Sequence, residues 1–89
     1  MIDTSQPAIY SKVVTLISEV TGVDLDRVIP EAKLELDLAV DMTREFPLVV
    51  KQLNQFYEID LDTDLFFEEY EEPTVRDLVT FTTEEVALS

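Results

Sequence analysis

The stretch Asp37-Leu38-Ala39-Val40-Asp41-Met42-Thr43 joins a long loop to the second predicted helix. Asp41 suits the N-cap of that helix, because its side chain can accept backbone N–H bonds and its charge complements the helix dipole. Apolar residues then recur at helical spacing, which predicts a helix over about residues 42–57. Its inner face comprises Phe46, Val49, Val50, Leu53, Phe56 and Tyr57. Pro47 lacks the N–H that a helix interior requires, so we expect a start nearer Thr43 or a distorted first turn.

Before this stretch, the sequence predicts one helix and one long loop. Ser5 suits an N-cap, Pro7 suits a first turn, and Gly22, the chain's one glycine, suits a left-handed C-cap, which together place a helix over residues 6–21. Residues 23–41 then form a loop that we expect to contain one short turn before Pro30. We expect apolar side chains to hold this loop to the core, namely Val23, Leu25, Val28, Ile29, Leu34, Leu36 and Leu38.

After the second helix, a short helix is predicted over about residues 65–70, with Phe67 and one neighbouring aromatic residue in the core. Thr74 and Asp77 form a capping-box pattern that opens a last helix, which we expect to fray after Glu85. The predicted fold class is therefore all-α, a small three-to-four-helix bundle with a long first loop. Residues 1–89 make a single domain with a core over about residues 6–85.

Composition narrows the function classes. Twenty acidic residues against six basic ones give a net charge of −14, which argues against nucleic acid or an anionic membrane surface as a partner and favours a protein with a basic surface. Cysteine and histidine are absent from the sequence, which excludes disulfides, thiol nucleophiles, imidazole bases and Cys/His zinc sites. The first residues lack the basic and apolar regions of a signal peptide. We expect a cytoplasmic monomer.

In order and spacing, several motifs resemble the acyl and peptidyl carrier protein family over roughly residues 9–82. They are Val28, Leu34 and Asp37-Leu38 in the loop, Leu48-Val49-Val50 and Phe56 or Tyr57 in the second helix, Ile59 and Leu61 after it, and Thr74-Val75 at the last helix. The resemblance implies a bundle of three main helices, one short helix and a long first loop. It also implies an attachment loop of the form Asp-Leu-Gly-x-Asp-Ser-Leu, whose serine carries 4'-phosphopantetheine.

At the serine position of that loop this chain has Met42, and at the glycine position it has Ala39. A thioether has no hydroxyl to esterify, so we expect no phosphopantetheine and regard Met42 as a vestigial attachment position. A register shifted by one residue puts Thr43 opposite the serine. Its alcohol is secondary and, in a helix that has already begun, would be rotated by about 100° and displaced by about 1.5 Å, so we expect no modification there.

The charge distribution also departs from the family, which presents an acidic second helix to basic enzymes. Here the second helix is nearly balanced, and no basic residue lies between Gln52 and Val75. Instead, acidic residues are concentrated in the segment 58–72, which contains Glu58, Asp60, Asp62, Asp64, Glu68, Glu69, Glu71 and Glu72.

Part of this acidic segment matches a calcium-loop pattern, with Asp60, Asp62 and Asp64 at positions one, three and five and Glu71 at position twelve. Position six requires glycine for its sharp turn, and Leu65 stands there. We therefore expect no specific metal site, and at most weak cation binding by the four carboxylates.

Three hypotheses follow. The first is a non-enzymatic carrier-like domain, without catalytic residues, that acts through protein recognition. For it we predict partner contacts at Asp41, Met42, Thr43, Arg44, Lys51, Asp62, Asp64, Glu68 and Glu69. The second is a functional acyl or peptidyl carrier in fatty-acid, polyketide or peptide-type biosynthesis, modified at Thr43. The third is an acidic mimic of nucleic acid that inhibits a nucleic-acid-binding protein.

Overall fold

A computed structural model of the chain describes residues 2–89 and contains four α-helices and one short 3-10 helix. The α-helices are α1 (Gln6–Thr21), α2 (Glu45–Tyr57), α3 (Thr63–Glu69) and α4 (Val75–Leu88), and the 3-10 helix is η1 (Leu25–Arg27). Within residues 2–89 there is no strand, and the one isolated β-bridge pairs Lys33 with Thr74. The predicted all-α bundle with a long first loop is confirmed.

The predicted signals at the ends of α1 and α4 largely hold. Gly22 adopts a left-handed φ of 78° and its N–H donates to the Ser18 carbonyl at 2.8 Å, which closes α1. Thr74 and Asp77 form the reciprocal capping box. One detail of the prediction was wrong: Ser5 is the N-cap residue of α1, but its side chain makes no capping bond.

The helix α2 begins three residues later than predicted, because residues 42–44 form a turn. The Asp41 carbonyl accepts from the N–H groups of Glu45 at 2.8 Å and Phe46 at 3.0 Å. Pro47 therefore stands in the first turn of α2, where a backbone N–H has no intrahelical partner. The later start removes the conflict that Pro47 posed for a helix beginning at Met42.

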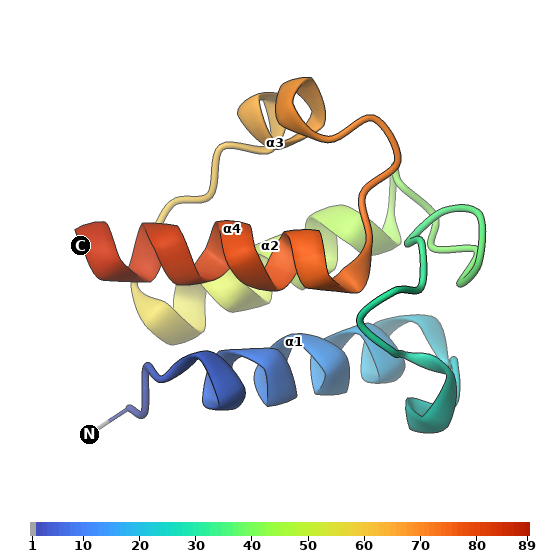
Figure 1. The fold of residues 1–89 in the computed structure, drawn as a ribbon, viewed down its shortest axis with the longest axis horizontal. Coiled ribbons are helices and arrows are strands. Elements are labelled where there is room, and N and C mark those ends of the chain that lie inside the picture. The colour runs from blue at the N-terminus through green and yellow to red at the C-terminus, as the bar shows by residue number, and fades with distance from the viewer. Residues whose placement is uncertain (1) are drawn as a thin grey trace.

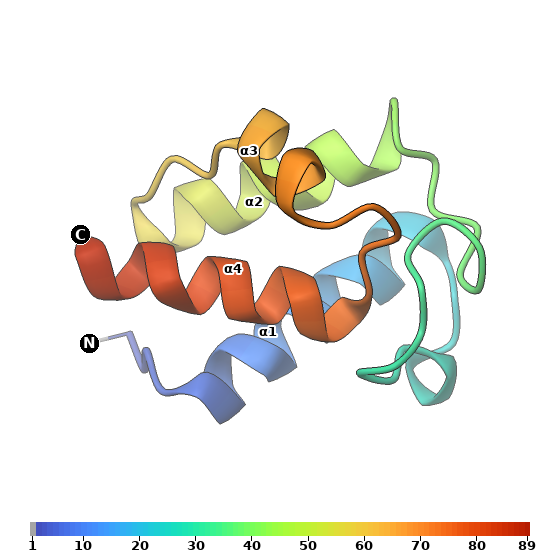
Figure 2. The same ribbon diagram turned by 45° about the horizontal axis from the view of Figure 1, so that its top comes forward.

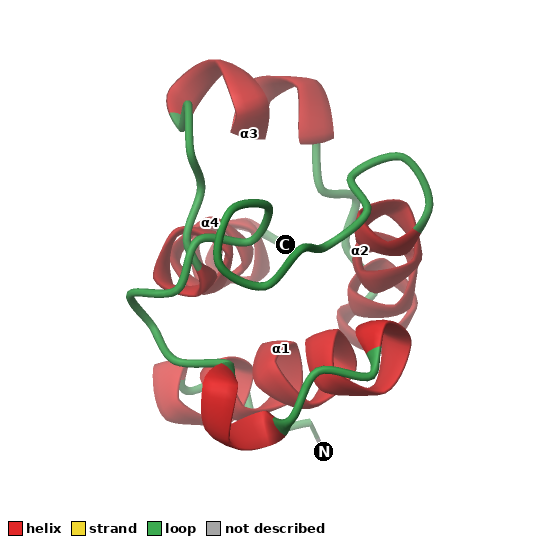
Figure 3. Ribbon diagram, turned by 90° about the vertical axis from the view of Figure 1, so that its right-hand side faces the viewer, coloured by secondary structure: helices red, strands yellow, loops and turns green. Residues whose placement is uncertain are grey.

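The core lies between the three longer helices. α1 packs against both α2 and α4, and α3 lies across the opposite side of the molecule from α1 (Figures 1 and 3). The start of α1 and the end of α4 lie at one end of the molecule and the long loop lies at the other (Figure 2). Fully buried side chains come from every α-helix and from the loop, including Ile9, Val13, Ile17, Val28, Leu34, Val49, Leu53, Phe66, Val75 and Leu78.

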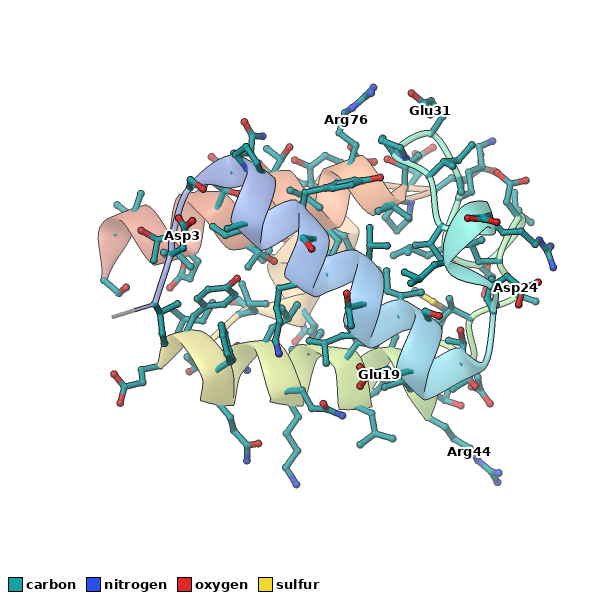
Figure 4. All side chains as sticks on the ribbon, turned by 90° about the horizontal axis from the view of Figure 1, so that it is seen from below. Asp3, Glu19, Asp24, Glu31, Arg44 and Arg76 are labelled. Carbon is teal, nitrogen blue, oxygen red and sulfur yellow. The ribbon has the colours of Figure 1, made fainter. Side chains whose placement is uncertain are left out.

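The long loop is tied to the start of α4 by backbone bonds. Leu34 N–H donates to the Pro73 carbonyl, and Val75 N–H donates to the Ala32 carbonyl, each at 3.0 Å. Beside these bonds, Arg76 pairs with Glu31 at 3.1 Å at the edge of the molecule (Figure 4). The loop is therefore held in place by more than the burial of its side chains.

Several predicted apolar contacts were wrong. Leu25, Ile29 and Leu36 are exposed, because the loop turns repeatedly and only some of its apolar residues face inward. Phe56 is also exposed and lies under the Lys12 ammonium, 4.1 Å from the ring centroid. The last helix continues to Leu88, beyond the predicted fraying point.

Candidate functional site

The corner before α2 is organised by the carboxylate of Asp41. Its Oδ1 accepts hydrogen bonds from Thr43 N–H at 2.9 Å, from the Thr43 hydroxyl at 2.8 Å and from Arg44 N–H at 3.2 Å. These donors hold the pKa of Asp41 below its usual range, the Thr43 hydroxyl contributing most. In return, Glu45 Oε1 accepts from Asp41 N–H at 2.8 Å. Asp41 therefore holds the turn over residues 42–44 in place. The prediction that Asp41 is the N-cap of the second helix was wrong, because α2 starts later and its N-cap is Arg44, three residues after Asp41.

Met42 and Thr43 point to different surroundings at this corner. Met42 is half-buried against the core, whereas Thr43 is exposed. Modification of Thr43 was not expected because a helix that had already begun would rotate and displace its hydroxyl. That reason does not apply, since α2 starts at Glu45, after Thr43. The Thr43 hydroxyl is therefore exposed at this corner, and it donates to Asp41 Oδ1.

Beside α3, two adjoining hollows share Met42 and Phe67 in their walls, and we call the pair the Met42–Phe67 groove. The first hollow has a volume of about 260 Å³, with an apolar lining of Leu36, Met42, Phe67 and Pro73 and a charged lining of Lys33, Glu35, Glu71 and Glu72. The second has a volume of about 420 Å³ and is lined by Met42, Phe46, Pro47, Val50, Lys51, Asn54, Gln55, Leu61, Thr63 and Phe67. The groove therefore joins the long loop, the start of α2 and the outer side of α3.

The charges along the groove are uneven. In the first hollow, Lys33 pairs with Glu72 at 2.7 Å, and the hydrogen bond and charge of that partner raise the pKa of the Lys33 ammonium. Glu35 and Glu71 have no cationic partner within the described residues. In the second hollow, Lys51 is the only charged residue among the described lining residues, beside the amides of Asn54 and Gln55. One end of the groove is thus acidic and the other is weakly basic.

Two adjacent phenylalanines of α3 have opposite roles. Phe66 is 1% exposed and its ring lies within 6 Å, centroid to centroid, of the rings of Phe46, Phe67, Tyr70 and Phe81. Phe67 is 41% exposed and forms part of the groove wall. The prediction that Phe67 belongs to the core was therefore wrong. The core residue is its neighbour, because α3 starts at Thr63 and turns Phe66 inward.

The predicted partner-contact residues do not all meet. Met42 and Lys51 line the groove, and Asp41, Thr43 and Arg44 are exposed at its corner, where Arg44 projects away from the bundle (Figure 4). Asp62, Asp64, Glu68 and Glu69 are exposed on or beside α3 but line neither hollow. Sequence reasoning missed Leu36, Glu35 and Pro73, because no local pattern brings the loop beside α3.

The calcium-loop pattern does not form a loop. Asp62 is the N-cap of α3 and accepts from Leu65 N–H at 3.1 Å, so the pattern's central positions are helical. Among residues 2–89, no group of three or more acidic side chains converges in a way that could hold a metal ion, and this covers Asp60, Asp62, Asp64 and Glu71.

The chain matches no protein-family model and no curated protein. Across residues 2–89, every helix falls short of the length and apolar character needed to cross a bilayer.

Proposed function

We propose that this chain is a non-enzymatic, acyl-carrier-protein-like domain that acts by recognising another protein. The observation that carries the proposal is the Met42–Phe67 groove, an open apolar surface beside the position where a carrier would hold its prosthetic group. Apolar side chains left in solvent at such a surface favour protein association.

Chemistry at the corner supports a binding role over a catalytic one. Met42 offers a thioether, which neither attacks an electrophile by losing a proton nor holds a phosphodiester. The sequence has no histidine or cysteine to form a nucleophile–base pair with Thr43. The polar groups of the corner instead satisfy one another around Asp41.

The charge of the chain supports a basic partner. Eight carboxylates lie within residues 58–72 without a basic residue among them. Such a field attracts a cationic surface and repels acidic ones, which adds to the association rate and to specificity.

A functional carrier modified at Thr43 is the second candidate. The favouring observation is that the Thr43 hydroxyl is exposed, precedes α2 and lies 2.8 Å from a carboxylate oxygen. This candidate would make 4'-phosphopantetheine the cofactor, and the arm would leave from a turn instead of a helix.

Intact mass spectrometry separates the two candidates. The protein is incubated with a promiscuous phosphopantetheinyl transferase and coenzyme A, beside the variants Met42→Ser and Thr43→Ala. We expect no mass gain by the unaltered protein and a gain of one arm by Met42→Ser. A gain by the unaltered protein that disappears in Thr43→Ala would establish the carrier and refute the recognition proposal.

Recognition itself is tested by isolating the tagged protein from its native host. We expect a partner that is retained by the unaltered protein and by Leu25→Gln, and lost by Leu36→Gln. Both leucines are exposed loop residues, and only Leu36 lines the groove. Equal retention by the two variants would show that the groove is not the contact surface.

A further inference from the structure

The groove walls contain apolar side chains that no other part of the described chain covers. Leu36 is 62% exposed and Phe67 is 41% exposed, and both face the first hollow beside the half-buried Met42. Exposed leucine and phenylalanine side chains on one surface favour binding there, because a partner that covers them removes apolar area from water.

The size of the hollows indicates what they accept. Pockets that enclose a drug-sized molecule have volumes of about 300–1,000 Å³. The first hollow, at about 260 Å³, falls below that range, and the second, at about 420 Å³, lies near its lower end. Two small adjoining hollows are better filled by successive side chains of one segment than by a single ligand.

A helical segment fits the surface better than an extended one. Extended peptides bind by adding a strand to an exposed sheet edge, and within residues 2–89 the only ladder pairing is the single bridge between Lys33 and Thr74. A helix presents apolar side chains three, four and seven residues apart on one face, so that neighbouring anchors can enter adjoining hollows.

The charges give this segment a direction. At the first hollow, the carboxylates of Glu35 and Glu71 face solvent without a cationic partner in the described chain, since Lys33 is taken by Glu72. At the second hollow, Lys51 is exposed and likewise has no partner there. Opposite charges at the two ends of a groove favour one orientation of a charged segment and disfavour its reverse.

From these observations we infer that the Met42–Phe67 groove binds an amphipathic helix of a partner protein in one orientation. The cationic end of the helix lies over Glu35 and Glu71, its apolar face fills the two hollows, and its other end, anionic or polar, lies beside Lys51. This inference rests on the proposed recognition function and specifies its partner. A second copy of the chain is a poorer occupant, because two molecules of charge −14 repel each other.

The test uses the 89-residue protein labelled with ¹⁵N and a designed helical peptide of about 16 residues, about 24 Å long. The peptide has leucines on one face, lysines at one end, glutamates at the other, and a nitroxide spin label at the lysine end. A second peptide carries the lysines at the opposite terminus, so that chain direction is not confused with charge direction. A scrambled peptide of equal composition and no apolar face is the control.

We expect both amphipathic peptides to shift amide signals of the groove and the scrambled peptide to leave them unchanged. The spin label should broaden the amides of Glu35, Leu36 and Glu71 and spare those of Lys51 and Gln55. The variant Glu35→Gln/Glu71→Gln should raise the Kd about five- to tenfold, because two surface charge pairs are lost. Leu36→Gln should raise it about tenfold, and the matched Leu25→Gln should not change it.

Other outcomes overturn the inference in distinguishable ways. Broadening that is uniform along the groove, or centred on Lys51, would refute the direction while leaving protein recognition intact. Peptides that leave the groove amides unshifted would refute the helical occupant. Shifts of the same amides on concentrating the protein alone, without a response to peptide, would assign the groove to a second copy. A pantetheine arm on the native protein would refute the proposed function whatever the peptides do.

Discussion

Replacement of Phe66 by alanine tests how α3 is held to the bundle. Phe66 is the one buried residue of α3, and it joins a cluster with Phe46, Tyr70 and Phe81. Truncation of a buried phenylalanine costs about 3–5 kcal/mol, from lost burial and from the cavity that remains. A domain of this length has a free energy of unfolding of about 4–13 kcal/mol, so Phe66→Ala should remove a large share of it.

The matched control is Phe67→Ala, one residue along the same helix. Phe67 is 41% exposed, so its truncation should lower the free energy of unfolding by only about 1–2 kcal/mol. Helix propensity changes equally in both variants, since each replaces phenylalanine by alanine. The difference between them, about 2–3 kcal/mol, therefore reports burial.

Urea unfolding followed by far-UV circular dichroism measures both free energies. If Phe66→Ala fails to fold, Phe66→Leu keeps the test workable, with an expected loss of about 1–1.5 kcal/mol. Equal losses for the two alanine variants, or a larger loss for Phe67→Ala, would refute the inward orientation of Phe66 and the exposure of the groove wall.

Four further results are expected. Gly22→Ala should lower the free energy of unfolding by about 1 kcal/mol in urea unfolding, because alanine is strained at a φ of 78°, while its Cβ would meet no atom within 4 Å and so add no clash. Conversely, Ala39→Gly should raise the free energy of unfolding by about 0.5–1 kcal/mol, because it relieves the same strain at a φ of 54°. Thr74→Ala should lower the thermal midpoint in calorimetry through a loss of about 1 kcal/mol, since the capping box of α4 is broken, and an unchanged midpoint would contradict that role. The hydrogen bonds that Thr43 donates lower the pKa of Asp41, so the stability contributed by Asp41 is present above the pKa of an unfolded aspartate and is lost as pH falls through the lower folded pKa. The NMR signal of the Thr43 amide should therefore titrate with a midpoint below the pKa of an unperturbed aspartate. A midpoint at or above that pKa would rule out the hydrogen bond.

Within the candidate site, the sequence indicated that the Asp41 carboxylate accepts backbone N–H bonds, and it does so in the turn before α2, although the N-cap of α2 is Arg44. Met42 and Lys51 line the groove, and their contact with a partner stays a prediction. The acidic residues of α3 were placed correctly on the surface but not in the groove, because helical phase determines which side of α3 faces it.

The C-terminal end of α1 and the start of α4 could be derived from the sequence alone, because Gly22 and the Thr74–Asp77 pair act through hydrogen bonds to residues close in the chain. Only the tertiary structure decided that Leu34 is buried and Leu36 exposed, and that Phe66 faces inward and Phe67 outward. Burial of a side chain depends on which distant elements pack against it, and the spacing of apolar residues within one segment does not specify those elements. The groove exists because the loop bonds to the start of α4 and lies beside α3, so its walls come from segments that are far apart in the chain.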